Sequence, residues 1–98
     1  MAEVTIVYWR DIPAQVIVGR GRRAVKVALP ERFEQAIDRA AMKSGAAGSD
    51  DYLAGFRKAD PIPVDGGDEE AAAHTAQRIE TDYDAPRLKA LIANDGWS

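Results

Sequence analysis

Cysteine is absent from this 98-residue chain, and histidine occurs only once. Without a thiol, disulfides, thiolate-bound metals and cysteine nucleophiles are all excluded. We interpret the single histidine, His74, as a surface residue, because a histidine base needs a nucleophile and an orienting partner. No apolar run approaches the ~20 residues that span a bilayer, and the first residues are not typical of a signal peptide. We therefore expect a cytoplasmic protein.

Large apolar residues are scarce, because alanine supplies much of the 46% hydrophobic content. A chain of this length suits one domain, since two halves would each have too small a core to fold alone. We expect one α+β domain over residues 1–98, with a three- or four-stranded, mainly antiparallel sheet and helices packed on one face.

Charge is unevenly distributed along the chain, although the formal net charge is only −3. Residues 10–32 hold six basic and two acidic residues, whereas residues 60–84 hold eight acidic residues and one basic residue. The basic part suits an acidic partner, or the two parts screen one another in the folded chain. A predicted helix begins with three acidic residues, Asp68, Glu69 and Glu70. A favourable interaction with the helix dipole explains them better than a metal site does.

Apolar residues alternate with polar ones near the N-terminus, which predicts three strands over 4–9, 15–18 and 22–28. Gly19-Arg20-Gly21 reads as the turn of a hairpin rather than a phosphate loop, because a strand follows it instead of a helix. Residues 62–64 fit an edge strand or a loop equally well.

The pattern changes to a helical period at Pro30, a residue favoured at a helix start. A helix ends at Gly45, and Ser49 then caps a second helix that we expect to continue to Lys58. Further helices are predicted over 68–82 and from Pro86 to Asp95. The face of the sheet is expected to be covered by large side chains of the first two helices: Phe33, Ile37, Leu53 and Phe56.

Basic and aromatic side chains of the N-terminal strands form the candidate interaction surface. Arginine and tryptophan are favoured in interface hot spots, and arginines on a ribbon suit phosphate contacts. The alternative is that Trp9 packs in the core, with the arginines solvated or neutralised by the acidic helix start. The candidate binding residues are Trp9, Arg10, Arg20, Arg22, Arg23 and Lys26; we assign no catalytic or metal-binding residue.

The run from Arg23 to Pro30, followed by two helices, resembles a ribbon-helix-helix DNA-binding domain. In such domains a strand of each subunit enters the major groove. In this chain the outward residues of that strand would be Ala24, Lys26 and Ala28. Only Lys26 among them has a polar side chain that could contact bases. The strand is also expected to pair within a hairpin. A DNA regulator is therefore an alternative function, and we expect no nucleic-acid partner.

Three longer runs resemble a small proteobacterial family of "virulence factor" domains: YWRDIPAQV at 8–16, LPERFEQAID at 29–38 and RLKALIAN at 87–94. Members of that family occur beside genes for folate- and corrinoid-dependent methyl transfer. The resemblance implies an accessory role in one-carbon metabolism. We expect a non-enzymatic module that binds a larger protein partner. We expect it to use no cofactor and to bind no membrane. The other alternative is a carrier of an anionic cofactor at the arginine-rich hairpin.

Overall fold

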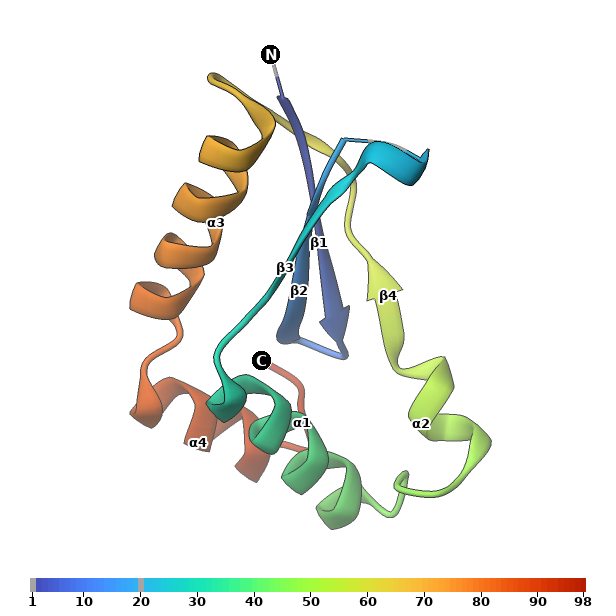
Figure 1. Ribbon diagram of the computed structural model, residues 1–98. Coiled ribbons are helices and arrows are strands. Elements are labelled where there is room, and N and C mark those ends of the chain that lie inside the picture. Colours follow the sequence, from blue (N-terminus) through green and yellow to red (C-terminus); the bar gives the residue numbers. More distant parts are fainter. Residues whose placement is uncertain (1, 20) are drawn as a thin grey trace.

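A five-stranded antiparallel sheet is the centre of the computed structural model, which describes residues 2–19 and 21–98 (Figure 1). Three strands lie in the order β3-β2-β1, and both β4 and β5 pair with the free side of β1. The α+β class and the antiparallel sheet are thus confirmed. The strands are β1 (Ala2–Trp9), β2 (Ile12–Val18), β3 (Val25–Ala28), β4 (Phe56–Lys58) and β5 (Ile62–Val64).

The β1–β2 hairpin sets the register of the sheet. Val4 pairs with Val18, but the register shifts between Val7 and Tyr8, which pair with Gln15 and Pro13. Such a bulge bends the strand and increases its twist. Of the two residues between the strands, Arg10 and Asp11, Arg10 has a left-handed φ of 54°.

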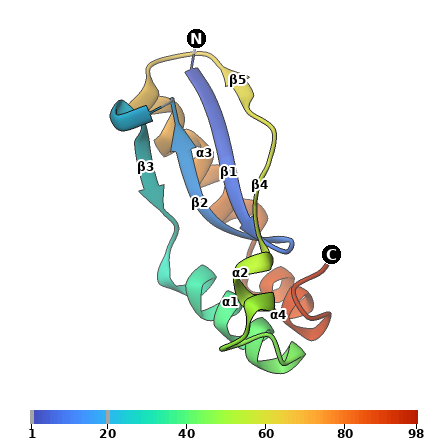
Figure 2. The same ribbon diagram turned by 90° about the vertical axis from the view of Figure 1, so that its right-hand side faces the viewer.

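Helices cover one face of the sheet and one of its ends. The helix α3 runs along the sheet and packs on β1, β2 and β3, whereas α1 and α4 pack together at the end where β1 meets β2 (Figures 1 and 2). The short η1 follows β2 at the opposite end (Figure 1). The helical elements are η1 (Gly21–Arg23), α1 (Glu31–Ser44), α2 (Asp50–Ala54), α3 (Asp68–Asp82) and α4 (Ala85–Ala93).

One contiguous cluster of buried apolar side chains joins the sheet to the helices. Buried alanines of α1 and α3 contribute small side chains to this cluster, and larger residues fill the space around them. Burying them removes apolar surface from water, at about 25 cal/mol per Å². The largest fully buried side chains are Trp9, Phe33, Ile12, Val4, Val16, Val18 and Pro13.

The second predicted helix is wrong in its length and its buried face. The helix α2 ends at Ala54. After Gly55, residues Phe56–Lys58 form β4, which pairs with β1. Leu53 is 71% exposed and Phe56 is 38% exposed, so neither covers the sheet as expected. Phe33 and Ile37 are buried as expected. The segment over 62–64 is a strand, β5, which pairs with β1 beside the four-strand path β3-β2-β1-β4.

Candidate functional site

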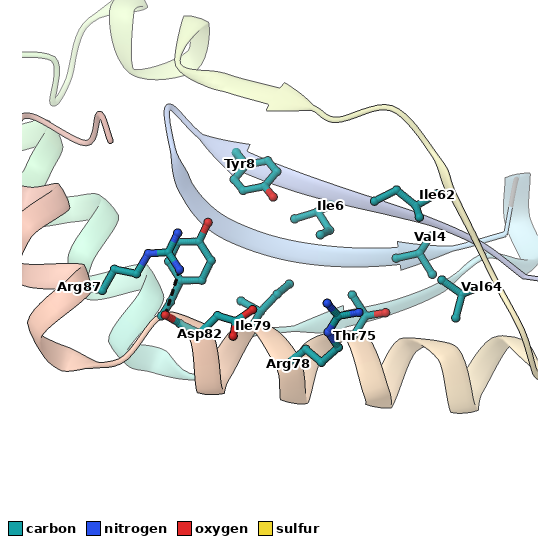
Figure 3. Close-up of a pocket in the computed structure, with 11 residues that line it drawn as sticks. Val4, Ile6, Tyr8, Ile62, Val64, Thr75, Arg78, Ile79, Asp82 and Arg87 are labelled. Atoms are coloured by element: carbon teal, nitrogen blue, oxygen red, sulfur yellow. Dashed lines mark hydrogen bonds between the residues drawn. The ribbon is translucent and has the colours of Figure 1, made fainter.

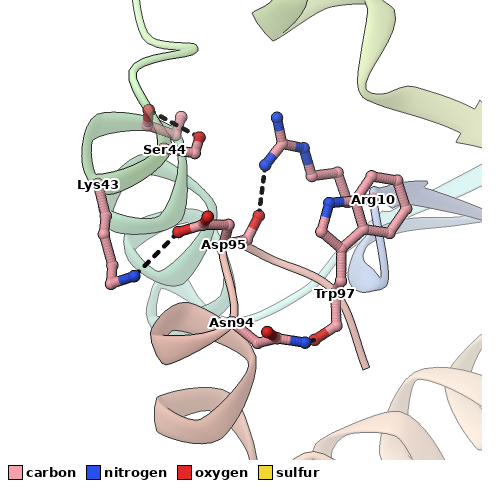
Figure 4. Close-up of polar contacts among 7 residues, drawn as sticks. Arg10, Lys43, Ser44, Asn94, Asp95 and Trp97 are labelled. Carbon is pink, nitrogen blue, oxygen red and sulfur yellow. Dashed lines mark hydrogen bonds and ion pairs between the residues drawn. The ribbon is translucent and has the colours of Figure 1, made fainter.

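Trp9 and Arg10, the first two predicted site residues, lie where β1 meets β2. Trp9 is fully buried and its indole N–H donates to the Tyr52 carbonyl at 2.8 Å. Arg10 lies over the rings of Trp9 and Trp97 at 4.7 and 5.4 Å, and it donates to the Asp95 carbonyl at 2.6 Å (Figure 4). These contacts tie the turn to the C-terminal residues.

Neighbouring contacts strengthen the same junction. Lys43 of α1 forms an ion pair with Asp95 at 2.9 Å (Figure 4). The backbone N–H of Ser98 donates to Asp11 at 2.8 Å. This hydrogen bond is the main cause of a lowered pKa of the Asp11 carboxyl, and Arg57 lowers that pKa further. Trp9 and Arg10 thus lie in a junction where their own contacts and those of their neighbours stabilise the fold.

Arg22, Arg23 and Lys26 are exposed on η1 and β3. None of their side chains has a hydrogen bond or ion pair to the described residues. The length of β2 separates η1 from Trp9 by roughly 20 Å, so the structure does not bring the predicted site residues together (Figure 1). Arg20 lies outside the described residues.

The start of α3 lies beside the hairpin turn, as one of the sequence interpretations expected. A Cβ at Gly19 would be 3.4 Å from a carboxylate oxygen of Asp68. Arg22 and Arg23 nevertheless form no ion pair with α3 in the described part of the chain. The acidic residues therefore lie near the ribbon without pairing with these two arginines.

A pocket of about 250 Å³ opens between α3, β1 and β5 (Figure 3). Its apolar part comes from alternate residues of the two strands and from one helical isoleucine. Its polar part comes from Tyr8 of β1, from the second half of α3 with Tyr83 after it, and from Arg87 of α4. The lining residues are Val4, Ile6, Tyr8, Ile62, Val64, Thr75, Arg78, Ile79, Asp82, Tyr83 and Arg87. We call this the Tyr8–Arg87 pocket.

Each of the two tyrosines that line this pocket has an arginine over its ring, and one of these arginines, Arg87, also lines the pocket. Arg87 lies over the Tyr83 ring at 4.0 Å, and Arg57 lies over the Tyr8 ring at 4.6 Å. Burial raises the pKa of the Tyr8 phenol above its ordinary value of 10.0; Tyr83 raises it further, whereas Arg57 and Arg87 lower it. The Tyr8 phenol consequently stays protonated, and so remains a hydrogen-bond donor, at neutral pH.

Hydrogen bonds fix the two arginines. Arg87 donates to the Asp82 carbonyl at 3.1 Å, as Figure 3 shows. Arg57 donates to the Arg10 carbonyl and to the Asp11 carboxylate, both at 3.0 Å. Arg87 therefore keeps a net charge at the pocket, because the group to which it donates is a neutral carbonyl.

The Tyr8–Arg87 pocket has polar groups that the protein leaves unused. Neither the Tyr8 nor the Tyr83 hydroxyl has a hydrogen-bond partner among residues 2–19 and 21–98, and the same holds for the Arg78 guanidinium. Such donors, next to an aliphatic surface, suit an anionic group carried on a small apolar body. Asp82 is the one acidic residue in the lining.

Sequence reasoning missed this pocket because its residues come from three separate segments. The alternation of Val4, Ile6 and Tyr8 already placed them on one face of a strand. Tyr83 and Arg87 are likewise close in the sequence. Only the fold brings these two residues together with those of the strand. In the described residues, no group of three or more acidic or histidine side chains could hold a metal, and no helix is long and apolar enough to cross a bilayer.

These features define a small α+β domain with an open antiparallel sheet and a tyrosine- and arginine-lined pocket at its edge. The chain belongs to the family described as Virulence factor, whose model matches residues 7–92. The matched range includes Tyr8, Arg78, Tyr83 and Arg87 of the pocket. No curated protein and no solved structure matches the chain.

Proposed function

We propose that this chain is a non-enzymatic cytoplasmic binding module whose ligand places an anionic group in the Tyr8–Arg87 pocket. One observation carries the proposal: unpartnered phenol and guanidinium donors face the same pocket as five aliphatic side chains. Charge-assisted hydrogen bonds from arginine would hold the anion. The aliphatic side chains would gain from covering the apolar part of the ligand.

The dimensions of the pocket restrict the ligand. About 250 Å³ is at the small end for drug-sized molecules, so a single ring or a short chain fits. A larger cofactor or a protein would insert only its end. The carboxylate of Asp82 would repel a second anionic group beside it, which favours a ligand with one compact anionic group.

Small aromatic probes test the proposal. We expect benzoate and phenyl phosphate to bind in a saturable way, and the neutral benzyl alcohol to bind at least ~5-fold more weakly, because it lacks the charge-assisted contacts. Calorimetry or an NMR titration measures the three affinities on the full chain.

Two variants and one control locate the binding. Arg87→Gln removes the charge and Tyr8→Phe removes one hydroxyl, and each is expected to weaken phenyl phosphate binding. Tyr52→Phe is the matched control, because it removes a phenol that does not line this pocket. Equal affinity for benzyl alcohol, or full affinity in Arg87→Gln, would contradict the proposal.

The earlier expectations differ in how well the geometry supports them. An anionic ligand fits this pocket better than the hairpin, because Arg22 and Arg23 are exposed and line none of the described pockets. An accessory role for a larger methyl-transfer enzyme stays a prediction from the family resemblance. Enrichment of such an enzyme with the tagged chain from the native organism would support it.

A further inference from the structure

A second concave surface lies between α1 and α4. Its volume is about 560 Å³, and it shares no lining residue with that pocket. We call it the α1–α4 groove. It is lined by Arg32, Gln35, Ala36, Arg39, Ala85, Leu88, Lys89 and Ile92.

Every charged side chain that lines the groove is basic. Arg39 and Lys89 have no hydrogen bond or ion pair to the residues that the structure describes. Arg32 donates to the Glu80 carbonyl at 2.7 Å, which leaves its charge unneutralised. In a chain with a net charge of −3, this is a local excess of positive charge.

Helical spacing explains why these charges stay unpaired. Ion pairs within a helix form between residues three or four positions apart. Neither Arg32, Arg39 nor Lys89 has an acidic residue at either spacing in the sequence. The acidic residues of α1 that are closest in sequence therefore lie on other faces of the helix.

The floor of the groove is apolar. Leu88 is almost fully buried and Ile92 is half-buried, so a ligand in the groove would touch aliphatic carbon. A groove between two helices with an apolar floor is a common receptor for an amphipathic helix, whose apolar residues enter at i, i+3 or i+4, and i+7. The basic rim then selects for acidic residues beside those anchors.

We infer that the α1–α4 groove docks an acidic amphipathic helix of a partner protein. The apolar floor favours such a helix over a nucleic-acid backbone, which would use the rim alone. The basic rim favours an acidic helix over a second copy of α1 or α4, whose residues at this surface are themselves basic.

The direct test uses a designed acidic helical peptide of about four turns, with leucines at i, i+3 or i+4, and i+7. Fluorescence anisotropy measures its binding to the full chain at about 150 mM salt. A peptide of the same composition in scrambled order is the first control. We expect the amphipathic peptide to bind at least ~10-fold more tightly than the scrambled one.

Charge reversal then locates the site. Arg39→Glu with Lys89→Glu should weaken binding at least ~10-fold, whereas Arg22→Glu with Arg23→Glu, an equal change of charge at the hairpin, should change it less than ~3-fold. Both pairs are exposed and unpaired in the described structure, so the circular dichroism spectrum should not change. Amide NMR shifts should cluster on α1 and α4.

Three results would overturn the inference. They are an affinity weaker than about 1 mM, equal binding of the scrambled peptide, and an equal or larger loss in the hairpin variant. If the groove variant loses structure, the shift map of the unmodified chain decides, and shifts centred away from α1 and α4 contradict the inference. None of these outcomes depends on phenyl phosphate binding, so the two proposals fail separately.

Discussion

Trp9 holds β1, the end of α2 and the C-terminal residues together. Two glycines make room for its ring: a Cβ at Gly55 would lie 2.6 Å from the indole nitrogen, and a Cβ at Gly96 would lie 2.9 Å from ring carbon Cζ3. Gly96 also has a left-handed φ of 94°. Gly55 has an ordinary helical conformation. The need for glycine at this position is therefore explained by the close approach of Trp9 alone.

Gly55→Ala is therefore expected to destabilise the fold by about 1–3 kcal/mol, the usual cost of overpacking. Chemical denaturation measures the change. In a Trp9→Phe background the same substitution should cost less, because the smaller ring leaves room for the methyl group. Equal costs in both backgrounds would show that the contact with Trp9 is not the reason for the glycine.

Tyr8 gives the pocket a pH signature. Its pKa is raised in the folded chain, so above pH 10 the folded state keeps a proton that the unfolded state releases. Stability is therefore unaffected by this group below about pH 10 and falls as the pH rises from there towards the folded pKa.

Phenolate absorbance during an alkaline titration checks this expectation. A phenol that titrates above the ordinary value of 10.0 should disappear in Tyr8→Phe and persist in Tyr52→Phe. Loss of an early-titrating phenol in Tyr8→Phe would contradict the raised pKa.

Strands and helices with a strong period could be predicted from the sequence, and those decided by distant contacts could not. The first helix was expected from Pro30, Gly45 and its apolar face, and α1 has those boundaries. By contrast, 56–58 continues a helical pattern in the sequence but forms β4, because β1 has a free side there. The close approach of Gly55 to Trp9 adds a constraint that local sequence does not contain.

The faces of α1 and α2 can be compared by truncation. Phe33→Ala should cost about 3–5 kcal/mol, because Phe33 is 1% exposed and its removal leaves a cavity. Leu53→Ala should cost less than about 1 kcal/mol, as surface changes do. Thermal or urea unfolding measures both, and a larger loss for Leu53 would mean that α2 packs differently.

The molecule as a whole combines separate cationic surfaces on an acidic chain. The sequence indicated the basic ribbon, because its residues are contiguous, and it missed the Tyr8–Arg87 pocket and the α1–α4 groove. Each of these is assembled from segments more than forty residues apart, such as Val4 with Ile79 and Arg39 with Lys89. Residue spacing within one segment cannot reveal such a site.

Two features of the fold disagree with a ribbon-helix-helix mode of DNA binding. The strand β3 already pairs with β2, and α2 has only five residues. We expect no duplex DNA binding tighter than about 10 μM at physiological salt, the range of non-specific contacts. A mobility-shift assay measures it, and sequence-selective, sub-micromolar retention that Lys26→Ala abolishes would contradict this expectation.

The most direct test of the anion-binding proposal is where phenyl phosphate binds, measured by methyl NMR on the full chain. The aliphatic side chains of the Tyr8–Arg87 pocket provide probes on three elements: Val4, Ile6, Ile62, Val64 and Ile79. We expect saturable shifts at these methyl groups, with Ile92 and Met42 unaffected. Shifts centred on Ile92 or Met42, or no saturable shift at any methyl group, would contradict it.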